Sequence, residues 1–165
     1  MSIKINYKNS GSKKPLNNLV LFTDEKFDIK PLKKHISSSE FFYVNDLLKT
    51  SDTNKNLFVF ELSSKKTIVL VSIKKKIEFS DMENLGAEFY GRIDSKKNTT
   101  YHINTDTIIG KDDSFIGHFL HGLRLKSYEF NKYKSKKTTR VISINVFGNK
   151  NKLSSKNQSR FKALE

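Results

Sequence analysis

Residues 119–137 read FLHGLRLKSYEFNKYKSKK, an apolar helical face that continues into alternating aromatic residues and lysines. Over the longer segment 111–130, apolar side chains recur every three or four residues, the spacing of one helix face. Acidic residues and Ser114 at its start suit the positive end of a helix dipole. The segment is therefore predicted to be an amphipathic helix whose buried stripe is Ile116, Phe119, Leu120 and Leu123.

Two interpretations compete for the aromatic end of this stretch. Tyr128, Phe130 and Tyr133 among lysines would suit a platform on which nucleic-acid bases stack. Alternatively the rings pack against the core and only the lysines face solvent, which is favoured because aromatic side chains commonly dominate core energetics. Gly117 and Gly122 each weaken the helix by about 1 kcal/mol relative to alanine. We expect them to allow close packing of this helix on a sheet.

Working outward, short apolar and β-branched runs predict the strands. They are residues 3–7, 19–22, 56–62, 67–74, 99–106 and 140–148, and the SSKK between the third and fourth predicts a hairpin. Further helices are predicted at 31–36, opening at Pro31, at 80–93, and at 154–165. For 80–93 we expect a capping box of Ser80 and Glu83, while 37–51 fits a helix or a strand. Strands alternating with helices predict an α/β fold, a mixed sheet flanked by helices.

Composition limits the classes of function. A chain of 165 residues fits one domain, and it has no cysteine for disulfides or thiolate metal sites. No apolar stretch approaches the roughly 20 residues of a membrane span, and the start lacks a signal-peptide core, so we expect a cytoplasmic location. The net charge of +14 would attract polyanions, yet only four of its 31 basic residues are arginines. Because bidentate recognition favours arginine, the lysine excess is weak evidence for a nucleic-acid partner.

No catalytic constellation emerges from the motifs. His118 and His121 lie at i, i+3 on a predicted helix, but two ligands do not make a metal site and no nearby carboxylate is evident. Neither phosphate loop nor nucleophile elbow occurs. Acid–base chemistry would need two carboxylates that converge. The candidate pairs are Asp112 with Asp113 and Glu78 with Asp81, and neither pair is placed to converge.

The opening stretch resembles the N-terminal domain of the leucyl aminopeptidases, the cytosol aminopeptidase family. There a small residue and a leucine on a helix lead into a Tyr-x-Phe-x-x-Tyr-Lys segment. The corresponding positions here are Gly122, Leu123, Tyr128, Phe130, Tyr133 and Lys134. The element order matches over essentially the whole chain, and the specific motif lies within 117–137.

The resemblance implies a macro-domain-like sheet of about six strands and a subunit of two domains. Residues 1–150 would form the N-terminal domain, and residues 151–165 would start the linker helix toward a C-terminal peptidase domain. Family members are typically hexamers that remove N-terminal amino acids with two divalent metal ions, zinc or manganese. The metal ligands and catalytic residues belong to the C-terminal domain, so none carries over onto this chain.

What carries over is a non-catalytic role in hexamer assembly and in shaping access to the peptidase domain. The expected partners are the chain's own peptidase domain and further copies of the subunit, and no membrane. Two alternatives remain open. One is a basic module that binds DNA or another nucleic acid. The other, less favoured, is a macro-domain-like binder of ADP-ribose. Such a site needs glycine-rich phosphate loops, whereas Gly110 and Gly148 each stand alone in the sequence.

Overall fold

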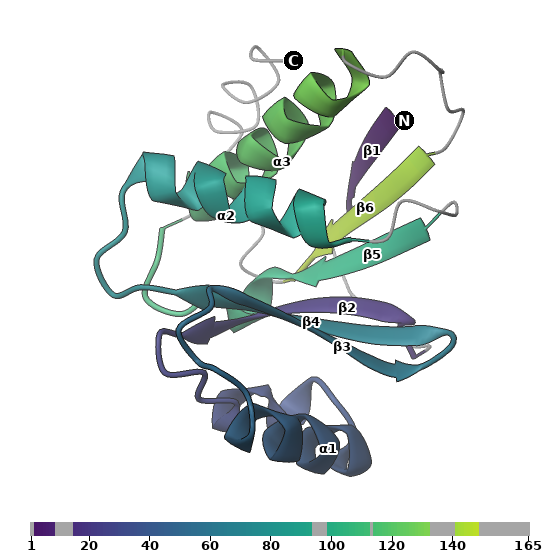
Figure 1. The fold of residues 1–165 in the computed structure, drawn as a ribbon, viewed down its shortest axis with the longest axis vertical. Helices are drawn as coiled ribbons and strands as arrows, with labels where there is room; N and C mark the ends of the chain where they lie inside the picture. Colours follow the sequence, from purple (N-terminus) through teal and green to yellow (C-terminus); the bar gives the residue numbers. More distant parts are fainter. Residues whose placement is uncertain (1, 9–14, 94–98, 113, 133–140, 149–165) are drawn as a thin grey trace.

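A six-stranded sheet with helices on both faces forms the body of the chain (Figure 1). This computed structural model describes residues 2–8, 15–93, 99–112, 114–132 and 141–148. The sheet order is β1-β6-β5-β2-β4-β3, and every neighbouring pair is parallel except the antiparallel β3–β4 hairpin. The predicted α/β class with a mixed sheet is confirmed. The strands are β1 Ser2–Tyr7, β2 Asn18–Asp24, β3 Leu57–Ser63, β4 Lys66–Ile73, β5 Thr99–Asn104 and β6 Val141–Phe147.

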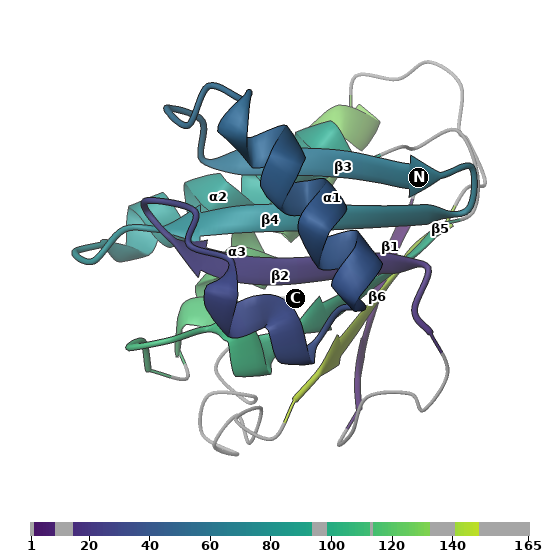
Figure 2. The same ribbon diagram turned by 90° about the horizontal axis from the view of Figure 1, so that it is seen from below.

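The helices divide between the two faces of the sheet (Figures 1 and 2). The short 3-10 helix η1 (Lys30–Lys34) and α1 (Ser38–Lys49) pack on one face, in an apolar cluster with β2, β3 and β4. Helices α2 (Phe79–Arg92) and α3 (Ser114–Lys132) cover the other face in a second and larger cluster. A further 3-10 turn, η2 (Thr105–Thr107), follows β5. No helix within the described ranges is both long enough and apolar enough to cross a membrane.

Local capping explains where α1 begins and resolves the ambiguous segment 37–51 as a helix. The Ser37 hydroxyl accepts a hydrogen bond from the Glu40 N–H at 3.3 Å, and the Glu40 carboxylate accepts from the Ser37 N–H at 3.0 Å. This capping box satisfies donors that the first helical turn leaves unpaired. The apolar side chains Phe41, Val44 and Leu48 then fall on the buried face.

The predicted start of α2 is wrong by a small margin. The box is formed by Glu78 and Asp81, whose carboxylate accepts from the Glu78 N–H at 3.4 Å, and not by Ser80 and Glu83. The chain therefore enters the helix at Phe79, and the Glu83 carboxylate is available for other contacts. Helix α3 begins at Ser114, whose N–H donates to the Asp112 carboxylate at 3.0 Å, three residues later than predicted.

Helices α2 and α3 approach closely at two glycines. An added Cβ at Gly122 would lie 1.9 Å from the carbonyl oxygen of Glu83, and one at Gly86 would lie 1.8 Å from that of Phe119. Each glycine thus lets the backbone of the opposite helix pass where a side chain would stand. The expectation that Gly122 serves close packing is correct, but the packing is helix against helix and not helix against sheet.

Candidate functional site

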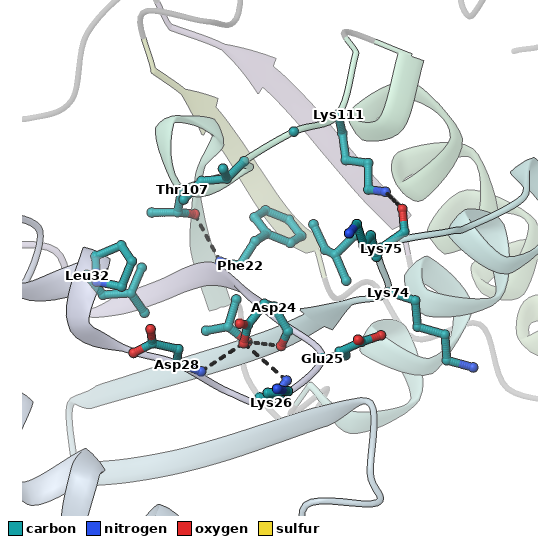
Figure 3. A pocket seen from close by; sticks show the side chains of 15 residues that line it. Phe22, Asp24, Glu25, Lys26, Asp28, Leu32, Lys74, Lys75, Thr107 and Lys111 are labelled. Atoms are coloured by element: carbon teal, nitrogen blue, oxygen red, sulfur yellow. Dashed lines mark hydrogen bonds between the residues drawn. The ribbon is translucent and has the colours of Figure 1, made fainter.

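A cleft of about 520 Å³ opens at the carboxyl ends of β2 and β4, beside the segment after β5 (Figure 3). Strand β2 has β4 on one side and β5 on the other, and the chain visits these neighbours by connections on opposite faces of the sheet. Such a reversal of strand order leaves a crevice at the strands' carboxyl ends, where open α/β sheets commonly bind ligands. The topology therefore marks this cleft as the candidate site.

Two hydrogen-bond systems build its walls. The Asp24 carboxylate at the end of β2 accepts from the backbone N–H groups of Lys26 and Asp28 at 3.1 and 2.9 Å, which folds the following loop tightly. On the opposite wall, the Thr107 hydroxyl accepts from the Phe22 N–H at 2.9 Å and donates to a backbone carbonyl at 2.8 Å. The second system joins η2 to β2, so hydrogen bonds of the folded backbone hold this wall of the cleft in place.

Charges of both signs line the cleft. Lys111 reaches from the segment after β5 and donates to the backbone carbonyl of Lys75 at 2.6 Å (Figure 3). Lys74 and Lys75 follow β4, while the carboxylates come from the last residue of β2, Asp24, and from the loop after it. Within the described part of the chain, no group of three or more histidine, aspartate and glutamate side chains is arranged to hold a metal ion. The described residues that line the cleft therefore combine apolar side chains with charges of both signs.

Two glycines near this edge allow backbone conformations with positive φ. Gly110 has a φ of 69° and Gly148 a φ of 135°, conformations that other residues rarely adopt. A Cβ at Gly148 would also lie 2.3 Å from the Thr105 hydroxyl. Gly148 is thus required by its contact with η2.

A carboxylate that the sequence did not suggest lies beside the paired histidines. The Oε1 of Glu83 is 2.9 Å from Nδ1 of His121 and 3.3 Å from Nδ1 of His118, and the ring of Phe79 stacks on His118 at 4.3 Å. Burial raises the pKa of Glu83, but the two histidine contacts outweigh it and hold that pKa below its usual value. Glu83 is far from both histidines in sequence, and the contact forms only because α2 packs against α3. The cluster ties α2 to α3.

The other two histidines lie apart from this cluster. Nδ1 of His35 is 3.0 Å from the side-chain amide nitrogen of Asn104, which joins η1 to the end of β5. Burial is the main cause that lowers the pKa of both His35 and His102.

The structure separates the motif residues of the opening stretch. Gly122 and Leu123 are buried, as predicted. Tyr128 is 72% exposed, so its prediction as a packing residue is wrong. Five residues turn a helix by about 140° beyond a full turn, which carries Tyr128 away from the face that Leu123 buries. The side chain of Phe130, and Tyr133 and Lys134 entirely, lie outside the described part of the chain, as does the predicted helix 154–165.

A family model described as the N-terminal domain of the cytosol aminopeptidase family matches residues 46–137, more than half of the chain. The chain belongs to this family. The matched segment runs from the end of α1 through α3, and so includes the β3–β4 hairpin and the α2–α3 pair. The membership inferred from the Gly122–Lys134 motif is confirmed.

Solved structures of this family share the fold. A mutant of tomato leucine aminopeptidase superposes with a TM-score of 0.69 at 14% identity, covering 98% of this chain and 35% of that one. The cytosol aminopeptidase from Coxiella burnetii gives a TM-score of 0.55 at 12% identity, covering 96% and 30%. No curated protein sequence matches. The chain therefore spans about a third of the length of these solved aminopeptidases.

Proposed function

We propose that this domain is the non-catalytic N-terminal part of a dinuclear-metal aminopeptidase that removes N-terminal amino acids from peptides. The family match at residues 46–137 is the observation that carries the proposal. The correspondence with tomato leucine aminopeptidase adds support, since 98% of this chain aligns with 35% of that protein. The remaining length of such a protein accommodates a separate peptidase domain, where two zinc or manganese ions would act.

In this proposal the domain assists hexamer assembly and shapes access to the peptidase domain, in the cytoplasm. Its exposed apolar side chains support such a role, since large exposed apolar residues are available for protein contacts. Phe42 and Tyr43 project from α1, and Leu125 and Tyr128 from α3. These two helices lie on opposite faces of the sheet (Figure 1). Exposed apolar side chains thus lie on helices of both faces of the sheet.

Hydrolysis of leucine p-nitroanilide tests the non-catalytic part. The purified 165-residue chain, supplied with Mn²⁺ or Zn²⁺, should release no nitroaniline above the buffer rate. Tomato leucine aminopeptidase in the same assay is the positive control. Metal-dependent turnover by the chain alone, abolished by a chelator, would contradict the proposal.

Nucleic-acid binding is a second candidate because Tyr128 has an exposed ring and follows Arg124 by one helical turn on α3, in a chain of net charge +14. An exposed aromatic among basic residues suits base stacking with phosphate contacts. Filter binding to single-stranded DNA at two salt concentrations should show a steep fall in affinity with salt. Tyr128→Ala should weaken binding, whereas Tyr43→Ala, a matched exposed tyrosine on α1, should not. No retention at low salt removes this candidate.

A further inference from the structure

Seven charged side chains line the cleft at the carboxyl ends of β2 and β4, and none of them forms an ion pair within the described part of the chain. They are Asp24, Glu25, Lys26, Asp28, Lys74, Lys75 and Lys111. The ion pairs among the described residues lie elsewhere, on α1, between α1 and β4, and between α2 and α3. The charges of the cleft are therefore not neutralised by contact with one another.

The two signs of charge come from different segments. All three carboxylates belong to the end of β2 and the loop after it, whereas three of the four lysines follow β4 or β5. In the view of Figure 3, the Asp28 carboxylate and the Lys111 ammonium group lie on opposite sides of Phe22. Lys111 uses one of its three N–H donors on the Lys75 carbonyl and keeps two for a ligand. The cleft thus has one wall that is mainly acidic and one that is basic.

Apolar side chains also line the cleft. Phe22, Leu32 and Ile73 are almost fully buried there, but Ile109, in the segment after β5, is 65% exposed. An apolar body in the cleft would remove Ile109 from water, which is favourable. Pockets that bind small molecules commonly have this composition, mainly apolar with a few polar groups, and volumes of about 300–1,000 Å³.

The two walls select the charge of the ligand. A phosphate-bearing ligand would be repelled by three carboxylates, and a purely cationic ligand by four lysines. A zwitterion with an apolar body instead meets each wall with the opposite charge. A space of 520 Å³ is about 8 Å across if equal in all directions, close to the roughly 7 Å that two extended residues span.

We propose that the cleft binds a dipeptide with free termini and apolar side chains. Its ammonium group lies toward the carboxylates of the β2 loop, and its carboxylate lies toward Lys75 and Lys111. Capture of a free peptide terminus is a recurring mode of peptide recognition. A free amino acid carries the same two charges within one residue, where they are too close together to meet both walls.

The experiment is a titration of the isotope-labelled 165-residue chain with the dipeptide Val-Leu, followed through the backbone amide signals in NMR. The signals of cleft residues such as Lys26 and Gly110 should shift and saturate, while those of β1 stay in place. Because exposed ion pairs are weak, the dissociation constant should lie in the millimolar range. N-acetyl-Val-Leu and Val-Leu amide each lack one terminal charge and should bind about two- to fivefold more weakly. Free valine should also bind more weakly.

Matched variants assign each terminus to its wall. Lys111→Met should weaken Val-Leu about two- to fivefold but leave the amide unaffected, because the amide has no carboxylate to lose. Glu25→Gln combined with Asp28→Asn should weaken Val-Leu to a similar degree and leave N-acetyl-Val-Leu unaffected. Ile109→Ser should weaken all of these ligands, since each presents the same apolar side chains.

Lys4→Met and Glu61→Gln are the controls, because they remove exposed charges from the two edge strands and should leave binding unchanged. The amide spectrum of each variant shows whether it is folded, and the ligand series on the wild-type chain stands without the variants. No saturable shift at tens of millimolar Val-Leu overturns the proposal. So does affinity that ignores the removal of either terminal charge, tighter binding of free valine, or loss of binding in the controls. The proposal concerns binding alone and is independent of the aminopeptidase assignment.

Discussion

Alanine at Gly122 offers the sharpest test of how α2 and α3 are held together. The added methyl group would lie 1.9 Å from the carbonyl oxygen of Glu83 and 2.6 Å from its Cα, both backbone atoms of the facing helix. Contacts between non-bonded heavy atoms are optimal at about 3.5–4.0 Å, so the helices must separate by more than about 1 Å. No rotation of a side chain relieves the clash, because backbone atoms meet the methyl group.

The expected magnitude follows from two opposing terms. Overpacking a well-packed interior typically costs about 1–3 kcal/mol, and here the upper end applies because the obstacle is backbone. Alanine in place of glycine within a helix stabilises the folded state by about 1 kcal/mol. The free energy of unfolding should therefore fall by about 2 kcal/mol, which lowers the melting temperature of a chain of this size by about 4–8 °C.

Thermal and urea unfolding of Gly122→Ala measure the effect, and Gly91→Ala is the matched control. Gly91 lies on α2 with nothing within 4 Å of the position of an added Cβ. That variant should gain about 0.5–1 kcal/mol from helix propensity alone. Gly86→Ala should behave like Gly122→Ala, since its methyl group would meet the backbone of Phe119 at 1.8 Å. If Gly122→Ala is as stable as Gly91→Ala, the close contact between the helices is wrong.

Three further changes test the walls of the cleft and the helix cluster. Thr107→Val should lower the free energy of unfolding by about 1–3 kcal/mol, because the buried Phe22 N–H loses its acceptor, while Thr107→Ser should retain most of it in urea titrations. Gly148→Ala should cost about 1–3 kcal/mol in the same titrations, since its positive φ strains alanine and its methyl group meets Thr105. The pKa of Glu83 lies below its ordinary value of 4.5 when folded, so its stabilisation is full above that pH and is lost as the pH falls through the folded pKa. Stability measured against pH should therefore fall less steeply below pH 4.5 for Glu83→Gln than for wild type; an unchanged slope would contradict the lowered pKa.

Sequence patterns predicted most of the elements because burial repeats along a strand or helix. The continuous apolar run 19–22 and the β-rich run 67–74 both correspond to largely buried strands. The hairpin of β3 and β4 was likewise visible, since both runs and their turn are adjacent in the chain. Local signals of this kind require no knowledge of distant neighbours.

Contacts between segments distant in sequence could not be predicted from these local patterns. The approach of Glu83 to His118 and His121 depends on how α2 crosses α3, and nothing in either segment encodes that pairing alone. The cleft depends on β5 lying beside β2, a neighbour 75 or more residues away. Tyr128 was predicted to pack because aromatic residues usually do, but its exposure is decided by the angle around α3. The residue type alone did not indicate to which side of α3 the Tyr128 side chain points.

The natural polypeptide that carries these residues provides the most direct test of the central proposal. Its intact mass and its peptides can be read by mass spectrometry after capture with an antibody raised against the 165-residue chain. The account predicts one polypeptide roughly three times as long, in proportion to tomato leucine aminopeptidase, that includes a metal-binding peptidase domain. A polypeptide with no such domain would contradict it.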